Sequence, residues 1–386
     1  MKFPIYLDYA ATTPVDVRVA EKMMKYLTIS GIFGNPSSSS HVYGWKAYEA
    51  VSSARNNIAS FFGVCPEDII FTSGATESNN LAIKGIVYAY QSRGKHIITS
   101  MTEHKSVLNT FYYLKKLGFL VTFLFPGRDG LISLESLKKE IRYDTILVSL
   151  IHANNETGVI QDVEMFGKFC RSKGIFFHVD ATQSVGKLSI NLMKLPIDLM
   201  SFNSHKVYGP KGVGGLFIRK KYKIHIKAQI HGGGQEYGIR SGTLPVHQIV
   251  GMGEAYRILH EEMKIEVHRF KYLKHYLLNG LQKITKISVN GTLKNSISTL
   301  LNVAFHNINS SILILELHDI AVSPSSACVS STYESSYVLH SMGCNNDTIN
   351  SSVRFSLGRF TTFEEIKFSL YKIKSAIFRL RDSNML

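Results

Sequence analysis

Five apolar runs between Ile69 and Lys206 each end in a cluster of polar side chains, and this repeat constrains the fold more than any other feature. Segments with helical spacing separate the runs, and several end in a glycine directly before the next run, as at Gly94, Gly118 and Gly174. Glycine just past a helix end is a common stop signal. Alternating helices and near-continuous apolar strands indicate an α/β fold with a mostly parallel sheet covered by helices on both faces. The runs are Ile69–Phe71, His96–Thr99, Thr145–Ile151, Ile175–Val179 and Asp198–Phe202.

The polar clusters fall where each predicted strand ends. Carboxyl ends of parallel strands meet at one edge of a sheet, which is where such sheets bind ligands. We therefore expect one binding site built from several distant segments. The clusters are Thr72–Glu77, Ser100–His104, His152–Gly158, Asp180–Gln183 and Asn203–Lys206.

The pattern changes after about residue 255. A long helical stretch covers Gly253–Ile284, and short strand-like runs and a last helix, Ile366–Leu380, follow it. Thr362 and Glu365 have the spacing of a capping box in front of that helix. We predict a large α/β domain over residues 15–255 and a smaller α+β domain formed by residues 1–14 and 256–386. Further expected elements are helices over Val15–Leu27 and Tyr43–Phe62 and strands over Leu301–Phe305 and Ser352–Leu357.

Composition indicates a globular protein of about two domains, since 45% of the 386 residues are hydrophobic and 19% are charged. The net charge of +15 permits a polyanion partner. Solvated lysine-rich faces are the simpler explanation, because no block of five or six like charges occurs. The four cysteines form no C-x-x-C pair, which argues against a zinc or thioredoxin-like site and for a reducing compartment. Neither a signal peptide nor a membrane span is expected, so we predict a cytoplasmic protein.

Lys206, Asp180 and the segment Ser73–Ser78 form a chemically coherent set. A lysine at a strand end can be partly desolvated, which favours the free amine that forms a Schiff base. A carboxylate such as Asp180 can pair with a pyridinium nitrogen, and a helix start such as Ala75 and Thr76 can hold a phosphate. Pyridoxal phosphate needs these three groups. Taken singly, each has a structural alternative: a solvated loop lysine, a salt-bridge or capping aspartate, and a helix cap.

Three further residues are candidates for chemistry. Cys328 lies among small polar residues in Ser323–Ser331, so it is either an accessible nucleophilic thiol or a small buried side chain. His104 follows a strand, where an imidazole can stack on a ring, move a proton or serve the structure. Arg354 alternates with apolar residues in a predicted strand and suits bidentate capture of a carboxylate, with Arg359 as a rival.

Taken together, these motifs resemble the cysteine desulfurases of the IscS/NifS family, which are relatives of the class V aminotransferases with the fold type I pyridoxal phosphate architecture. The matches occur in family order over nearly the whole chain, and details around Cys328, Glu334 and Arg359 resemble the housekeeping iron–sulfur cluster assembly branch. The matching motifs are Tyr6–Pro14, Thr72–Ser78, Thr102–His104, Asn154–Glu156, His178–Gln183, His205–Lys206, Arg240–Thr243, Ser326–Cys328 and Arg354–Arg359.

The resemblance implies a role for each matching residue. Cys328, Lys206 and His104 would be catalytic: Lys206 carries pyridoxal 5'-phosphate and acts as a base, and His104 stacks on the ring and relays protons. Cys328 would take the sulfur as a persulfide, through which it would also touch an iron–sulfur cluster transiently. Asn155 and Arg354 would hold the carboxylate of L-cysteine. The implied cofactor ligands are Ala75, Thr76, Asn155, Asp180, Gln183, Asn203, His205, Lys206 and, from a second subunit, Thr243.

The same resemblance implies a homodimer that passes sulfur to an iron–sulfur scaffold protein and other acceptors, including tRNA-thiolation proteins, without binding nucleic acid or membrane. The alternatives are another pyridoxal phosphate lyase or aminotransferase, such as a selenocysteine lyase, and a non-catalytic basic binding protein. The sequence departs from the family at Asn203, usually Ser, at Pro324-Ser325, usually Ser-Gly, and at Gln235 and Tyr237, often His and Arg. It also ends at Leu386, where relatives commonly continue into a tail that helps dock the scaffold.

Overall fold

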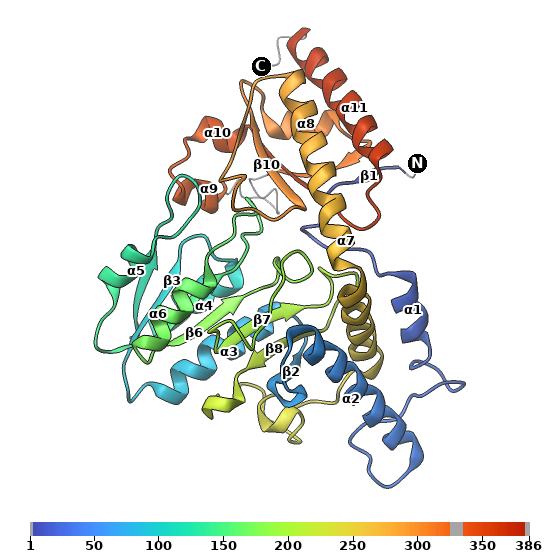
Figure 1. Ribbon diagram of the computed structural model, residues 1–386, viewed down its shortest axis with the longest axis vertical. Coiled ribbons are helices and arrows are strands. Elements are labelled where there is room, and N and C mark those ends of the chain that lie inside the picture. The colour runs from blue at the N-terminus through green and yellow to red at the C-terminus, as the bar shows by residue number, and fades with distance from the viewer. Residues whose placement is uncertain (1–2, 325–334, 383–386) are drawn as a thin grey trace.

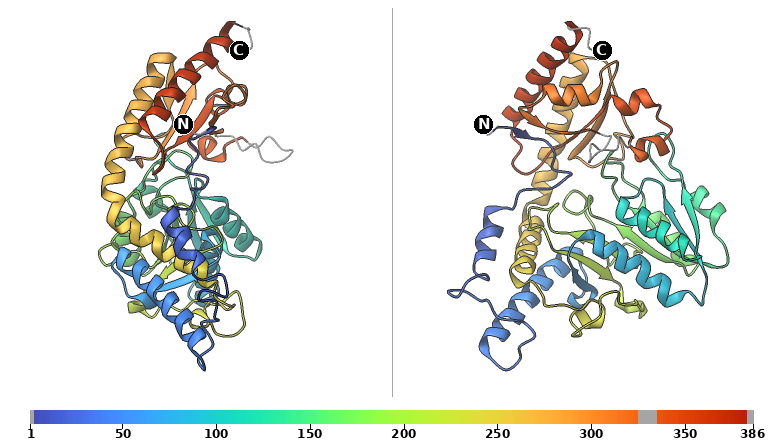
Figure 2. Two further views of the ribbon diagram at one scale, coloured as in Figure 1. Left: turned by 90° about the vertical axis from the view of Figure 1, so that its right-hand side faces the viewer. Right: turned by 180° about the vertical axis from the view of Figure 1, so that it is seen from behind.

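The structure is a computed structural model that describes residues 3–324 and 335–382 (Figure 1). A larger unit, at the bottom of the view, contains the main sheet, and a smaller unit lies above it. The long helix α7 (Val246–Ile284) runs from the first unit into the second, and the first residues of the chain also reach the upper unit. The view from behind shows the same division (Figure 2).

The main sheet has seven strands in the order β2-β8-β7-β6-β5-β3-β4. Only β8 is antiparallel to its neighbours, so the prediction of a mostly parallel sheet is confirmed. All five predicted strands form, each within one residue of its expected start. The strands are β2 (Ile69–Thr72), β3 (His96–Ser100), β4 (Leu120–Leu124), β5 (Thr145–Ile151), β6 (Phe176–Asp180), β7 (Leu199–Asn203) and β8 (Gly214–Ile218).

Helices cover both faces of this sheet, as the continuous apolar strands predicted. Residues that alternate along the strands divide between two cores, because successive side chains of a strand point to opposite faces. Helices α3 (Ala75–Tyr90) and α4 (Lys105–Lys116) pack on one face. Helices α2 (Val42–Phe62), α6 (Val163–Ser172) and the first half of α7 pack on the other. A short helix, α5 (Leu134–Glu140), follows β4.

The upper unit has a second, smaller sheet with the order β12-β13-β10-β9. Ile5 and Leu7 at the start of the chain pack into its core, and β1 pairs with β11 in parallel. The predicted capping box is present, since Thr362 N donates to Glu365 Oε2 at 2.8 Å and Glu365 N donates to Thr362 Oγ1 at 3.1 Å. The elements are β1 (Ile5–Tyr6), β9 (Ile287–Val289), β10 (Leu300–Phe305), α8 (Ser310–Glu316), β11 (Ile320–Ala321), β12 (Ser323–Pro324), α9 (Tyr337–Ser341), α10 (Asn346–Asn350), β13 (Ser352–Ser356) and α11 (Phe363–Asp382).

Helix α7 starts seven residues earlier than the sequence pattern indicated and passes residue 255 without a break. Its first half lies in the core of the lower unit and its second half in the core of the upper unit. Gly253 allows α2 to approach closely, because a Cβ there would lie 2.5 Å from Ala54 Cα. The glycine that weakens the helical pattern is therefore needed for packing. The domain division at residue 255 stays a prediction, with α7 shared by both parts.

Helix α1 is also shorter than expected, covering Val17–Met24 rather than Val15–Leu27. It begins after Asp16, whose side chain accepts a hydrogen bond from Arg18 N and caps the helix. Among the helices in the described ranges, none combines the length and the apolar character needed to cross a membrane. In the same ranges, no cluster of three His, Cys, Asp or Glu side chains has the arrangement of a metal site.

Candidate active site

The polar ends of the five predicted strands meet around a pocket of about 570 Å³. Besides these strand ends, the pocket is lined by the Ala10-Ala11 turn, by the connection from Lys211 to Val213, and by one strand of the smaller sheet. The site therefore lies between the two units of the structure. Predicted site residues that line it are Ala75, Thr76, His104, Asn155, Asp180, Gln183, Asn203, His205, Lys206 and Arg354.

The turn from β2 into α3 forms one wall of the pocket. Ala75 and Thr76 are the first residues of α3, where backbone N–H groups have no partner within the helix. Such a helix start attracts anions. Gly214 on β8 lets this turn sit close to the sheet, since a Cβ there would lie 2.7 Å from Gly74 Cα. Glu77 secures the turn by accepting from Ser73 N at 2.8 Å.

His205 and Asn203 lie beside this helix start. His205 Nδ1 is 3.1 Å from Thr12 Oγ1. Burial lowers the pKa of His205 to about 4, and the charges of Lys206 and Lys211 add to the effect. His205 is thus a neutral imidazole at physiological pH, suited to hydrogen bonding with an anion and not to charge neutralisation. Asn203, the departure from the family pattern, is also buried here.

Lys206 reaches across the pocket to the N-terminal segment. Its Nζ donates to the carbonyl oxygens of Ala10 and, at 2.6 Å, Ala11. Burial lowers the pKa of Lys206 from 10.5 to about 8, with a further contribution from Arg354, while Asp8 and Asp180 oppose the shift. With this pKa, roughly a tenth of the amine is uncharged at pH 7, far more than for an ordinary lysine. The uncharged amine is the form that makes a Schiff base.

Asp180 is 2% exposed at the end of β6. Its Oδ2 accepts from Asn79 Nδ2 at 2.8 Å, and its Oδ1 accepts from Thr182 N at 2.9 Å. These bonds fix the carboxylate and offset the cost of burying it. Gln183, three residues on, donates from Nε2 to the carbonyl oxygen of Ala10 at 2.8 Å.

His104 caps helix α4 through Nδ1, which accepts from Ser106 N at 3.1 Å. Desolvation lowers the pKa of His104, Asp180 opposes this shift, and Lys206 and Lys105 increase it. The lowered pKa favours the neutral imidazole. The contact through Nδ1 fixes the position of the ring, and His104 lines the pocket. A neutral imidazole in this position can accept or relay a proton.

Arg354 on β13 closes the side of the pocket that belongs to the smaller sheet. Its Nη1 donates to Asn155 O at 2.9 Å, and its Nη2 donates to Asp8 Oδ1 at 2.8 Å and Ser323 Oγ at 3.1 Å. The rival candidate, Arg359, does not line this pocket and is bound in a cluster of carboxylates. Of the two candidate arginines, Arg354 therefore lines the pocket and Arg359 does not.

Four buried polar atoms of the pocket residues have no hydrogen-bond partner within the part of the chain that the structure describes. They belong to pocket residues on or just after β5, β6, β7 and β13. The hydroxyl and the guanidinium N–H can donate to oxygen atoms of a polar ligand, and the two amide oxygens can accept from its donors. Together with a desolvated lysine, a fixed carboxylate and a helix N-terminus, they fit pyridoxal phosphate. The atoms are Asn155 Oδ1, Thr182 Oγ1, Asn203 Oδ1 and Arg354 Nε.

Two predicted site residues, Thr243 and Cys328, are not among the described residues that line the pocket. Thr243 is exposed and does not line it, so any contact with a cofactor would have to be in another subunit's pocket. Cys328 lies outside the described residues. The residues on either side of that segment are attached to the site: Ser323 Oγ accepts from Arg354 Nη2, and Ser336 Oγ donates to Glu156 Oε2 at 2.5 Å.

The sequence assigned no individual role to several residues of the site. Asn79 lies four residues into α3, where its spacing alone indicates only a helix position. Asp8 was part of a matching motif, but its pairing with Arg354 joins residues 346 apart in the chain. Glu156 is enclosed next to Arg354 and Ser336, and burial raises its pKa to about 7. Only the folded chain brings these groups together.

Comparison with known proteins agrees with this geometry. Residues 5–368 match the aminotransferase class-V family. Cysteine desulfurase IscS from Serratia proteamaculans is 58% identical over 382 residues, which cover 99% of this chain and 95% of that protein. IscS from Salmonella typhi is also 58% identical, with the same coverage.

Two solved structures share the fold. A NifS-like protein superposes with a TM-score of 0.91 at 38% identity, covering 97% of this chain and 100% of the other. SspA in complex with cysteine superposes with a TM-score of 0.83 at 36% identity, covering 93% and 100%. The chain belongs to the class-V aminotransferase family and, within it, to the pyridoxal phosphate-dependent cysteine desulfurases of the IscS/NifS type.

Proposed function

We propose that this pocket removes sulfur from L-cysteine, releases L-alanine and leaves the sulfur on Cys328 as a persulfide. The observation that carries the proposal is the convergence of Lys206, Asp180, His104 and Arg354 on one pocket. The family membership supports the same reaction. In the overall change, the carbon–sulfur bond of cysteine breaks, a sulfur–sulfur bond to Cys328 forms, and the thiol hydrogens end on alanine and the persulfide.

Pyridoxal phosphate, when bound, supplies an electron sink that weakens bonds at the substrate's α and β carbons. Lys206 is the residue that would hold it covalently, since its amine is desolvated and faces the pocket. Asp180, fixed by Asn79 and Thr182, would pair with the ring nitrogen. Ala75, Thr76, Asn203 and His205 would hold the phosphate with neutral donors.

Arg354 would bind the carboxylate of L-cysteine. Its guanidinium already contacts the Asn155 carbonyl and the Asp8 carboxylate, so it is oriented before substrate arrives. A pre-oriented, largely enclosed guanidinium loses little freedom when it binds a carboxylate in bidentate fashion. The unpartnered Nε of Arg354 is a further donor for the carboxylate, and Asn155 would contribute the N–H group of its side-chain amide.

Proton movement falls to Lys206 and His104. Burial lowers the pKa of Lys206 to about 8, so this amine can give up and take back a proton near neutral pH. Burial also lowers the pKa of His104, which favours the neutral imidazole as a proton acceptor. Lys206 Nζ is hydrogen-bonded to the Ala10 and Ala11 carbonyls, which would stabilise the protonated form of this amine. His104 is fixed through Nδ1 and would act through its other nitrogen.

The partners and the assembly belong to the same proposal. A homodimer would bring Thr243 of one subunit to the phosphate position of the other, which accounts for its exposed place away from its own pocket. Cytoplasmic sulfur acceptors, including an iron–sulfur scaffold protein, would take the sulfur from Cys328. SspA is described in complex with cysteine, which supports L-cysteine as the ligand of the matching pocket here.

The competing reactions are transamination and selenocysteine cleavage. Both need the same cofactor, but neither requires that the Cys328 thiol accept a sulfur atom from L-cysteine. The test combines the visible spectrum of the purified protein with assays of alanine and of thiol-releasable sulfur after L-cysteine is added. The proposal expects equal amounts of alanine and releasable sulfur, and loss of sulfur transfer in Cys328→Ala with the cofactor spectrum retained. Cys65→Ala, which changes an exposed cysteine that does not line the pocket, is the control. Unchanged sulfur transfer in Cys328→Ala would refute the proposal.

A further inference from the structure

Tyr208, two residues after Lys206, has a backbone conformation that aromatic residues rarely adopt. Its φ is 66°, in the left-handed region. Such a conformation persists only where surrounding contacts enforce it, and it is frequent at functional sites. The contacts here come from the N-terminal segment. Tyr208 N donates to Thr13 Oγ1 at 2.9 Å, and Tyr208 O accepts from Asp16 N at 2.9 Å.

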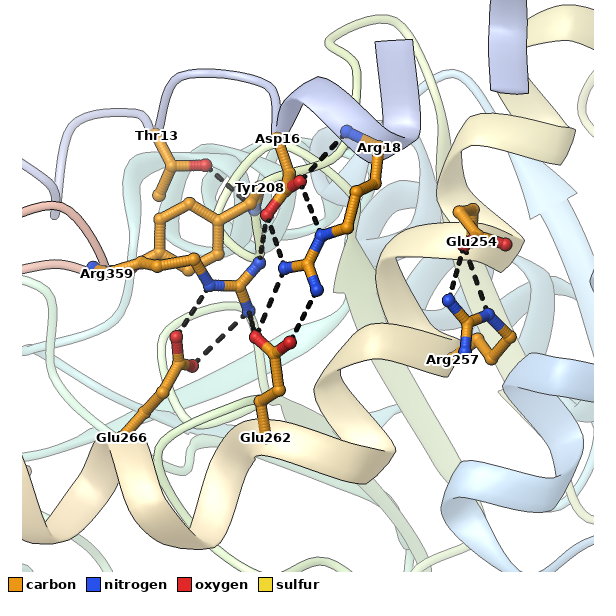
Figure 3. Close-up of polar contacts among 9 residues, drawn as sticks. All are labelled: Thr13, Asp16, Arg18, Tyr208, Glu254, Arg257, Glu262, Glu266 and Arg359. Carbon is orange, nitrogen blue, oxygen red and sulfur yellow. Dashed lines mark hydrogen bonds and ion pairs between the residues drawn. The ribbon is translucent and has the colours of Figure 1, made fainter. Parts of the chain in front are cut away.

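The side chain of Tyr208 is held by Arg359 from the smaller unit (Figure 3). Arg359 N donates to the Tyr208 hydroxyl at 2.6 Å. The Arg359 guanidinium lies over the Tyr208 ring, 4.3 Å from its centroid. A desolvated guanidinium over an aromatic ring is an attractive arrangement. Arg359 therefore contacts Tyr208 through both its backbone N–H group and its side chain.

Carboxylates from two other segments fix the Arg359 guanidinium, which is only 9% exposed. Its Nη1 is 2.7 Å from Asp16 Oδ2 in the N-terminal segment, and its Nε is 2.6 Å from Glu266 Oε1 on α7. Glu262 lies farther away, at 3.8 Å. Figure 3 shows these groups surrounding the guanidinium from several sides. With its donors engaged in this way, Arg359 has one defined position.

Tyr208 and Arg359 each lie close in the chain to a residue that lines the pocket. Tyr208 follows Lys206 on the loop after β7, and the same loop is bonded to the N-terminal segment through Thr13 N to His205 O at 2.9 Å. Arg359 follows Arg354 by five residues, just after β13. The Tyr208–Arg359 contact is thus a short connection between the lysine loop of the large unit and the strand of the small unit that carries the carboxylate-binding arginine.

We propose that Arg359 is a positioning residue of the reaction: through Tyr208 and Asp16 it sets the position of Lys206 relative to Arg354. It does not touch the pocket and acts on the substrate only through these neighbours. The inference rests on the proposed function, since Lys206 and Arg354 must act on the same bound amino acid. A fixed separation between them keeps that amino acid in the geometry that the reaction needs.

Arg18 provides a matched control. It pairs with two of the same carboxylates, Asp16 at 2.9 Å and Glu262 at 2.5 Å. Its side chain is 46% exposed. Within the part of the chain that the structure describes, it makes no hydrogen bond, ion pair or ring contact with Tyr208 or with β13. Arg18→Met therefore removes a cation from the same cluster while leaving the Tyr208–Arg359 contact in place.

The experiment compares Arg359→Met, Arg359→Lys, Tyr208→Phe and Arg18→Met with the unmodified holoenzyme. Three quantities are measured: kcat and KM for L-cysteine, the midpoint of the pH titration of the cofactor's visible band, and the melting temperature. Tyr208→Phe removes only the hydroxyl that accepts from Arg359 N, so it tests the contact without uncovering a buried charge. All kinetics are run well below the lowest melting temperature.

We expect Arg359→Met to raise KM for L-cysteine by about tenfold, as couplings between distinct sites typically do, and to shift the midpoint of the visible titration. Tyr208→Phe should change KM and the titration midpoint in the same direction, but by less. Arg359→Lys should bring both quantities part of the way back to the parent values. In Arg18→Met, KM should stay within about twofold of the parent value.

Two outcomes would overturn the inference. In the first, Arg359→Met and Tyr208→Phe change only the melting temperature, which would make the cluster purely structural. In the second, Arg18→Met reproduces their effects. A protein that binds cofactor but does not desulfurate cysteine would refute the proposed function instead, and the visible titration would still test this inference.

Discussion

Asn79 donates a hydrogen bond from Nδ2 to Oδ2 of Asp180 over 2.8 Å, and both side chains are buried. Asp180 also accepts from Thr182 N, so each of its oxygens has a partner. The second amide hydrogen-bond of Asn79 goes to Ser106 Oγ at 2.9 Å, next to His104. One asparagine on α3 therefore fixes the acid of the pocket and connects it to the histidine segment.

Asn79→Ala should weaken binding of pyridoxal phosphate without unfolding the protein. A hydrogen bond to a charged group contributes about 1.5–3 kcal/mol, so we expect the dissociation constant to rise by about ten- to a hundredfold. Equilibrium dialysis of the cofactor measures this. Asn56→Ala, an exposed asparagine on α2, is the control and should bind the cofactor as the parent does. Equal affinities for Asn79→Ala and the parent would show that Asp180 does not need this support.

Arg354→Lys should impair binding of L-cysteine more than turnover. Lysine keeps the charge but loses the planar pair of donors that binds a carboxylate in bidentate fashion and the contacts to Asp8 and Asn155. We expect KM for L-cysteine to rise by about tenfold or more, with a smaller change in kcat. Steady-state assays of alanine formation measure both. A fall in kcat at constant KM would assign Arg354 to a step after substrate binding.

Lys206 makes the stability of the cofactor-free protein depend on pH. Burial lowers its pKa from 10.5 to about 8, so between these values the unfolded chain binds more protons than the folded chain. The free energy of unfolding therefore rises with pH from about 8 to 10.5 on account of this group. Lys206→Met should be more stable than the parent below pH 8, by up to about 3 kcal/mol, and the difference should narrow towards pH 10. Urea unfolding at several pH values measures it, and a constant difference across that range would contradict the assigned pKa.

The buried ion pair between Arg55 and Glu236 should anchor the glycine-rich segment 231–238. Glu236 accepts from both nitrogens of the Arg55 fork, at 2.5 and 2.9 Å, and from Phe71 N at 2.7 Å, next to the pocket strand β2. Glu236→Gln leaves a buried guanidinium without its counter-charge, which we expect to cost about 3 kcal/mol of unfolding free energy. The double variant Arg55→Met/Glu236→Leu should regain most of this loss. Thermal unfolding of the three proteins measures this loss of stability. If Glu236→Gln is as stable as the parent, the ion pair does not anchor the segment.

The sequence predicted much of the main sheet because its signals are local. An apolar run followed by polar residues reports burial of a strand and exposure of its end within a few positions, and the five strands formed where expected. The capping box of α11 is likewise a contact between residues three apart. The start of α7 was predicted seven residues late, because Gly251 and Gly253 weaken the helical pattern for the sake of close packing against neighbouring helices.

By itself, the sequence determined the fold class, the strand-end position of Lys206, Asp180 and His104, and the membership of the family. Only the tertiary structure decided that Arg354 and not Arg359 faces the pocket, because one arginine lies within β13 and the other just after it. Only the structure revealed that Asn79 holds Asp180 and that Asp8 pairs with Arg354. The physical reason is the distance along the chain between the residues in contact. A strand or a helix cap depends on residues a few positions apart, whereas these two contacts join residues that are 101 and 346 positions apart. Such contacts contribute energy only after the chain has folded and brought the two segments together.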